Sequence, residues 1–127
     1  MFHHSEVGVH VTRKLYRTLL LLFLIVVTYL FAKEVNNHAI RIEHLDKVVH
    51  FGVFFALAFF SHRAFKFKIW FHMILLTSYG AAVEWMQSTL PYRQASLGDF
   101  IADISGAMSY FIALWLFDKY KQRRAAS

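Results

Sequence analysis

The chain of 127 residues contains no cysteine. This absence excludes a disulfide framework and catalysis by a thiol. A single proline and five glycines leave no proline- or glycine-rich linker that would separate two domains. The sequence also lacks a glycine-rich phosphate loop, a haem signature and the HExxH zinc motif. We therefore expect one domain, with no cofactor and no resident metal ion.

Apolar residues are what the chain has in abundance. At 57% hydrophobic and 18% aromatic residues, it is too apolar for an ordinary soluble domain. Four stretches approach the roughly 20 residues that an α-helix needs to cross a bilayer: Leu15 to Ala32, Leu45 to Phe65, Trp70 to Met86 and Phe100 to Phe117. The sequence therefore predicts an all-α fold, a four-helix transmembrane bundle.

The second stretch is the weakest of the four. Its apolar core from Val48 to Phe60, which contains His50, would cover only ~20 Å at about 1.5 Å per residue. A buried or re-entrant helix is the alternative to a full span here.

The basic residues are distributed unevenly between the two sides that four spans define. Of the 14 lysines and arginines, ten fall on the side of the termini: Arg13, Lys14, Arg17, Arg63, Lys66, Lys68, Lys119, Lys121, Arg123 and Arg124. The other side holds Lys33, Arg41, Lys47 and Arg93. The excess predicts that both termini are cytoplasmic. The net charge of +6 then reflects topology and contact with anionic headgroups, and no nucleic-acid partner is expected.

The ends of the chain are expected to be polar tails. Residues 1–14 and 121–127 flank a membrane domain of residues 15–120. The first tail carries His3, His4 and His10, which we interpret as parts of a disordered cytoplasmic segment that would bind metal only adventitiously. The first span reads as a retained signal anchor, because Leu30 occupies a position where cleavage requires a small residue.

Ionisable residues recur at helical spacing where three of the predicted helices meet the extracytoplasmic side. Residues three or four apart share a helix face, and charged groups at membrane depth are costly and mark functional sites. Because the topology places these faces at one end, we predict a single cluster there: Asp46, Lys47, His50, Glu84, Gln87, Arg93, Ser96, Asp99 and Asp103.

Two residues of this set also have a local explanation. Ser96 lies three residues before Asp99, which predicts a helix start with a capping box in which Asp replaces the usual Glu. Pro91 argues against a continuous helix through the loop from Ser88 to Ala95. Because the acidic residues outnumber Arg93 and Lys47, we expect a carboxyl to stay protonated or a cation to sit among them. Asp103 is expected to face Glu84 and either to be protonated or to share a proton with it.

Several of these residues form motifs of a known family. Asp46-Lys47-Val48-Val49-His50, Glu84-x-x-Gln87, Pro91-x-Arg93-x-x-Ser96-x-x-Asp99 and Gly106 together resemble the VanZ-like family of small bacterial membrane proteins, over roughly residues 45 to 110. The resemblance implies a multi-span protein of the bacterial cytoplasmic membrane. The family takes its name from a determinant of teicoplanin resistance, and the resemblance supplies no settled activity. Position 103, commonly asparagine in such proteins, is Asp103 here.

We interpret the cluster first as an outward-facing site for an envelope lipid or lipid-linked precursor, which would reach it laterally through the membrane. His50, Glu84, Asp99 and Asp103 are the candidate catalytic residues, with proton transfer assigned to His50 and Glu84. The candidate ligand-binding residues are Asp46, Lys47, Gln87, Arg93 and Ser96. Arg93 suits a phosphate or carboxylate because its planar guanidinium binds such groups at two points. The pattern does not decide between binding and catalysis.

Three alternatives compete with this interpretation. The charged residues could fix helix register in a structural or regulatory partner of other envelope membrane proteins, without catalysis. A proton or ion pathway is disfavoured, because polar residues thin out towards the cytoplasmic half, leaving Thr77, Ser78 and Tyr110. A zinc or manganese site is disfavoured by the lack of paired histidines and by the positive charge of Arg93.

Overall fold

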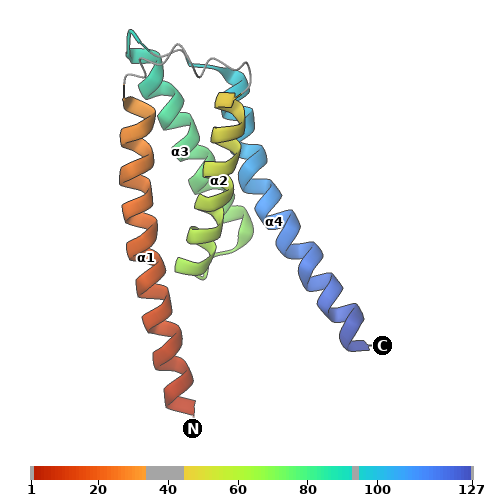
Figure 1. The fold of residues 1–127 in the computed structure, drawn as a ribbon. Helices are drawn as coiled ribbons and strands as arrows, with labels where there is room; N and C mark the ends of the chain where they lie inside the picture. Colours follow the sequence, from red (N-terminus) through yellow and green to blue (C-terminus); the bar gives the residue numbers. More distant parts are fainter. Residues whose placement is uncertain (1, 34–44, 93–94, 127) are drawn as a thin grey trace.

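The computed structural model describes residues 2–33, 45–92 and 95–126, which form four helices (Figure 1). These are α1 (Phe2–Ala32), α2 (Leu45–Ala64), α3 (Ile69–Thr89) and α4 (Leu97–Ala126). No strand occurs within these ranges. The predicted all-α fold with four helices is confirmed.

Consecutive helices run in opposite directions. The N-terminal end of α1 and the C-terminal end of α4 therefore lie at the same end of the molecule (Figure 1). At the other end, which we call the head, the end of α1 meets the start of α2, the end of α3 and the start of α4. Towards the termini, α1 and α4 diverge from each other (Figure 1).

Three of the helices are long and apolar enough to cross a membrane: His10–Ala32 within α1, α2 and α4. The second predicted span, where a re-entrant helix was the alternative, is among them. α3 is not, although it has 21 residues, because His72, Glu84 and Gln87 lower its hydropathy. The length and composition of these three helices indicate a membrane protein.

Both ends of the chain are helical where the sequence analysis expected tails. α1 begins at Phe2 rather than Leu15, and α4 continues to Ala126 through most of the predicted tail 121–127. Hydropathy predicts where the apolar surface of a helix ends. The helix itself can continue beyond that point until a residue that disfavours helix ends it. Within α1, Thr12 and Thr18 each donate a hydroxyl hydrogen bond to the carbonyl four residues earlier, at 2.8 and 3.0 Å.

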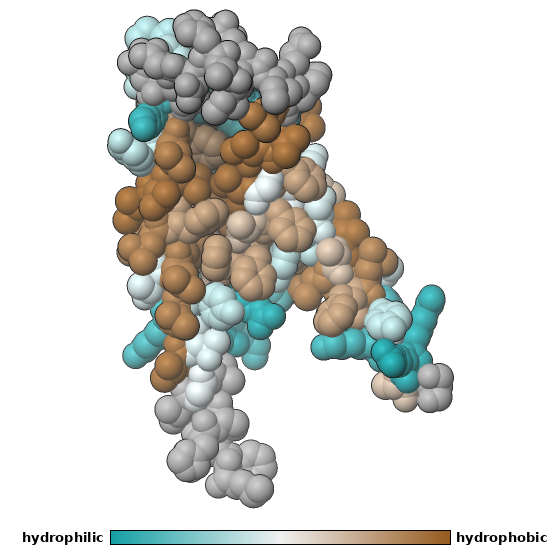
Figure 2. All heavy atoms as spheres, in the orientation of Figure 1, coloured by the Kyte–Doolittle hydropathy of each residue, from teal (hydrophilic) through white to brown (hydrophobic). Residues whose placement is uncertain are grey.

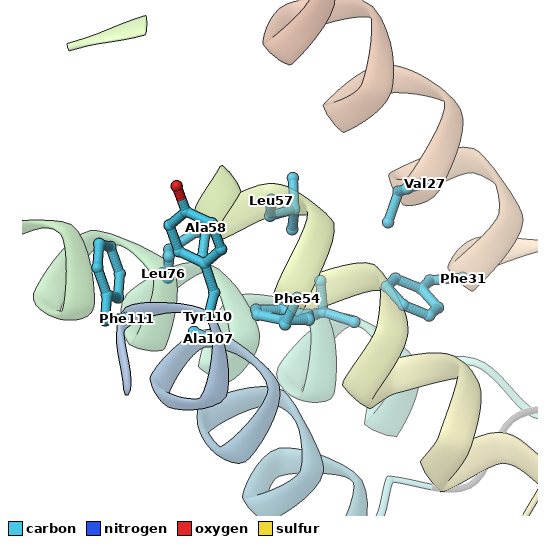
Figure 3. Close-up of a cluster of buried hydrophobic side chains, with 10 residues drawn as sticks. Val27, Phe31, Phe54, Leu57, Ala58, Leu76, Ala107, Tyr110 and Phe111 are labelled. Carbon is cyan, nitrogen blue, oxygen red and sulfur yellow. The ribbon is translucent and has the colours of Figure 1, made fainter. Parts of the chain in front are cut away.

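The buried apolar core receives side chains from all four helices (Figure 3). Its members are Val27, Phe31, Phe54, Leu57, Ala58, Leu76, Val83, Ala107, Tyr110 and Phe111. Many other large apolar side chains are exposed on the outside, and Figure 2 shows hydrophobic residues over the middle of the visible face. Such a surface is unfavourable in water, and a surrounding bilayer removes that cost.

α2 and α4 approach each other closely at Gly106, a crossing that positions the site. A Cβ atom added to Gly106 would lie 2.2 Å from the carbonyl oxygen of Phe51. Small residues at helix crossings in membranes allow such close contact. Because His50 neighbours Phe51 and Asp103 precedes Gly106 by three residues, this crossing brings His50 and Asp103 together.

Candidate functional site

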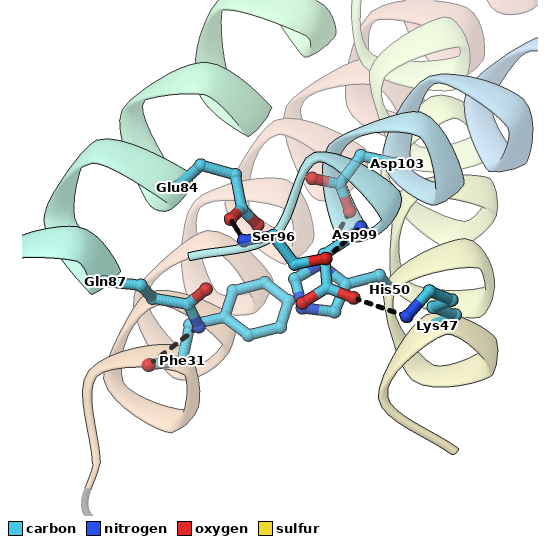
Figure 4. A network of polar contacts seen from close by, with 8 residues as sticks. All are labelled: Phe31, Lys47, His50, Glu84, Gln87, Ser96, Asp99 and Asp103. Atoms are coloured by element: carbon cyan, nitrogen blue, oxygen red, sulfur yellow. Dashed lines mark hydrogen bonds and ion pairs between the residues drawn. The ribbon is translucent and has the colours of Figure 1, made fainter. Parts of the chain in front are cut away.

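The centre of the site is the imidazole of His50, which projects from the first turns of α2 into the head. His50 is 4% exposed, and Asp103 on α4 is fully buried. Nδ1 of His50 lies 2.7 Å from Oδ1 of Asp103. The ring of Phe31 from α1 stacks on the imidazole at 4.6 Å between centroids. The orientation of His50 is thus fixed by three helices (Figure 4).

A second carboxylate, Asp99, faces the other nitrogen of the imidazole. Oδ2 of Asp99 lies 3.9 Å from Nε2 of His50, and its Oδ1 lies 3.9 Å from Nζ of Lys47. The Lys47 side chain is half exposed, whereas Asp99 is buried. His50 therefore lies between two aspartates, and Lys47 contacts the outer one.

The start of α4 is capped differently from the prediction. The amide of Asp99 donates to Oγ of Ser96 at 3.4 Å, so Ser96 has its expected N-cap role. The carboxylate of Asp99, however, points to Lys47 and His50 and does not return to the amide of Ser96. That amide donates to Oε2 of Glu84 on α3 at 2.9 Å. Glu84, which lies on the neighbouring helix α3, thus accepts the hydrogen bond that Asp99 was expected to accept.

Gln87 has a capping role at the end of α1. It is buried, and its Nε2 donates to the backbone carbonyl of Phe31 at 3.1 Å. The hydroxyl of Tyr92 donates to the next carbonyl, that of Ala32, at 2.8 Å. These contacts satisfy carbonyl groups that the last turn of a helix leaves without partners. Gln87, predicted to bind a ligand, lies at the site but uses its amide to hold α1.

Three carboxylate oxygens of the site have no hydrogen-bond partner among the described residues: Oε1 of Glu84, Oδ1 of Asp99 and Oδ2 of Asp103. One ligating atom each of His50, Glu84 and Asp103 lies within 4.8 Å of the others. Glu84 and Asp103 thus lie close, as expected, but the hydrogen bond of Asp103 is to His50. Buried acceptors without donors are costly, so the arrangement is suited to receiving a proton or a cation.

Two predicted site residues are not part of this arrangement. Asp46 is exposed in the first turn of α2 and makes no hydrogen bond or ion pair with another described residue. Arg93 lies outside the residues that the structure describes, so its role as an anion anchor remains a prediction.

A second polar group lies at the opposite end of the core, and Tyr110 is its only member that was singled out from the sequence. The hydroxyl of Ser61 and Nδ1 of His72 are 2.7 Å apart, and Nδ1 of His62 lies 3.2 Å from the hydroxyl of Tyr110. His72 is fully buried. The expectation that polar residues thin out here is wrong. The short connection between α2 and α3 was the available signal, because it brings the end of one helix beside the start of the next.

The described residues thus define an all-helical protein with three helices able to cross a membrane and a buried histidine surrounded by carboxylates at its head. Comparisons of the chain with family models, curated proteins and solved structures find no match. The chemistry of the cluster is therefore the basis for a functional assignment.

Proposed function

We propose that this chain is a VanZ-like protein of the bacterial cytoplasmic membrane, with four spanning helices and both termini in the cytoplasm. The antiparallel order of the helices, with both chain ends at one end of the molecule (Figure 1), supports an even number of spans. α3 has 21 residues, which at 1.5 Å each give about 31 Å, enough for the hydrocarbon core. Its polar residues His72 and Gln87 are buried, so they do not face lipid.

We further propose that the head binds an envelope lipid or lipid-linked precursor by its polar headgroup. The observation that carries this proposal is the buried His50–Asp103 pair with unpartnered carboxylate oxygens beside it. An imidazole held through one nitrogen by a carboxylate is a common arrangement for proton transfer through the other. In this proposal His50 exchanges a proton with the ligand, Asp103 positions the ring, and Arg93 binds a phosphate group.

The topology gives the first testable prediction. Because the chain has no cysteine, single cysteines can be introduced as Asn37→Cys, Gln94→Cys and Ser127→Cys. In intact cells or spheroplasts, an impermeant thiol reagent should label the first two and label the third only after permeabilisation. The reverse pattern would place the head in the cytoplasm and contradict an outward-facing site.

The ligand proposal predicts loss of co-purified anionic lipid in three variants: Arg93→Lys, His50→Ala and Glu84→Gln. A hydrogen bond to a charged group contributes about 1.5 to 3 kcal/mol, which corresponds to a roughly 10- to 100-fold loss of affinity. Retained lipid is measured by mass spectrometry on matched amounts of folded, monodisperse protein.

Asp118→Asn is the matched control, because Asp118 is exposed near the C-terminal end of α4, far from the head; it should retain lipid as the parent does. Unchanged lipid in all three site variants would refute the ligand proposal. The cluster would then serve helix packing, as expected for a structural partner of other envelope proteins.

A further inference from the structure

We infer that the head of the bundle binds a divalent transition-metal ion through His50, Glu84 and Asp103. No metal ion is expected from the sequence, because paired histidines are absent and Arg93 is positively charged. Each comes from a different helix, α2, α3 and α4, and only the folded bundle assembles them. The inference concerns a metal ion rather than the lipid of the proposed function and does not depend on that lipid.

The spacing of the donor atoms suits one ion. One donor atom from each of the three residues lies within 4.8 Å of the others. Donors about 2.1 Å from a shared ion lie ~4.2 Å apart when they face each other across it and ~3.4 Å apart in a tetrahedral site, so a separation of 4.8 Å must shorten by about 0.6 to 1.4 Å. Small side-chain rotations supply that movement. The 2.7 Å between Nδ1 of His50 and Oδ1 of Asp103 is a hydrogen bond that must open to ~3.0–3.4 Å for two adjacent ligands of one ion.

A buried acceptor without a donor points to a missing cation. Asp103 has no exposed surface, yet its Oδ2 has no hydrogen-bond partner among the described residues. That oxygen is directed towards α3, where a Cβ on Gly80 would approach it to 3.1 Å. Oε1 of Glu84, also on α3, is similarly unpartnered. A metal ion between α3 and α4 would satisfy both oxygens, whereas the apolar core offers them no donor.

Asp99 faces the ring nitrogen of His50 that would point away from the ion. Metal-binding histidines generally donate their second ring N–H to a carboxylate, which fixes the ring orientation. Binding of the ion to Nδ1 of His50 replaces its hydrogen bond to Asp103 and releases the shared proton to solvent. Nε2 then carries the N–H and faces Oδ2 of Asp99, 3.9 Å away. Asp99 is thus a positioning residue rather than a ligand. Lys47 balances Asp99, and its half-exposed side chain can turn to solvent when an ion adds positive charge.

The donor set selects the class of ion. One imidazole nitrogen with two carboxylates suits zinc or manganese, whereas calcium and magnesium prefer oxygen ligands alone. Tight binding of Mg²⁺ is therefore not expected at this site.

The test measures metal content directly. Protein with His3, His4 and His10 replaced by alanine, purified in detergent without a polyhistidine tag, is loaded with Zn²⁺ or Mn²⁺ and desalted. We expect about one ion per chain by elemental mass spectrometry, and a rise in melting temperature that Mg²⁺ does not give. Removing the three histidines excludes adventitious binding by the N-terminal segment.

Two isosteric variants locate the site. Glu84→Gln keeps an oxygen for the amide of Ser96, and Asp103→Asn keeps an oxygen for His50, so both should fold. Each should bind the ion at least tenfold more weakly, and Asp99→Asn should weaken binding roughly 10- to 100-fold as a positioning residue. Asp118→Asn, exposed on α4, should bind as the parent does.

Less than one ion per chain in the folded parent protein would overturn the inference. So would binding as tight as the parent's in both Glu84→Gln and Asp103→Asn. If either variant fails to fold, X-ray absorption at the metal edge of the parent decides. One imidazole with oxygen ligands is expected, and a spectrum with several imidazoles or none would refute the site. Metal content is measured on delipidated protein, so its outcome is independent of lipid retention.

Discussion

Replacing Gly106 by alanine is expected to destabilise the bundle by up to ~3 kcal/mol, the upper range for overpacking a tight contact. The added Cβ would lie 2.2 Å from the carbonyl oxygen of Phe51. Because that neighbour is backbone rather than a flexible side chain, α2 and α4 must move apart. The same movement would separate His50 from Asp103. Thermal unfolding in detergent and monodispersity on size exclusion measure the effect.

Gly52→Ala is the matched control. Gly52 lies in α2 one residue after Phe51, and a Cβ there meets nothing within 4 Å. Because alanine favours a helix over glycine by up to about 1 kcal/mol, this variant should be as stable as the parent or more stable. Equal losses in Gly52→Ala and Gly106→Ala would show that the α2–α4 crossing is not the sensitive contact.

The second large effect is expected at the buried pair of His50 and Asp103. Removing one partner of a buried hydrogen-bonded pair costs about 1 to 3 kcal/mol, because the other group is left without a partner, and costs more where that group is charged. His50→Ala and Asp103→Ala should each lose stability on this scale. The double variant should lose less than the sum of the two, with a coupling of about 0.5 to 3 kcal/mol.

Equilibrium unfolding of the parent, the two single alanine variants and the double variant measures the coupling. Asp103→Asn should stay close to the parent, because its amide oxygen can still accept a hydrogen bond from His50. Asp103→Lys should disrupt the head, since it places an ammonium group in a fully buried position. Strict additivity of the alanine variants would mean that the 2.7 Å contact contributes no net stability. A marked loss in Asp103→Asn would show that the charge itself is structural.

The number and type of helices could be predicted from the sequence because hydropathy over about 20 residues is a strong signal. The ends could not. Residues 2–9 precede the part of α1 that is apolar enough to cross a membrane, yet the helix continues through them. In contrast, α3 ends where Pro91 follows, with Leu90 in the extended conformation that a residue before proline prefers.

Helical spacing and antiparallel order were sufficient to predict that His50, Glu84, Asp99 and Asp103 converge. The choice of partners was not predictable, because it depends on side-chain reach across helices. Glu84 caps Ser96 where Asp99 was expected to, and Gln87 binds a carbonyl of α1 rather than a ligand. A local motif describes contacts within a helix, whereas these contacts form between helices.

The hydrogen bonds that close the head connect early segments of the chain to late ones. A chain emerges from the ribosome with its N-terminus first, so α1 is complete before Gln87 and Tyr92 exist to bind the carbonyls of Phe31 and Ala32. Glu84 is likewise synthesised before Ser96, whose amide donates a hydrogen bond to it. In a nascent chain that ends after α3, His50 therefore lacks Asp103 and Glu84 lacks the amide of Ser96. The head therefore closes only after the residues that begin α4 have been synthesised.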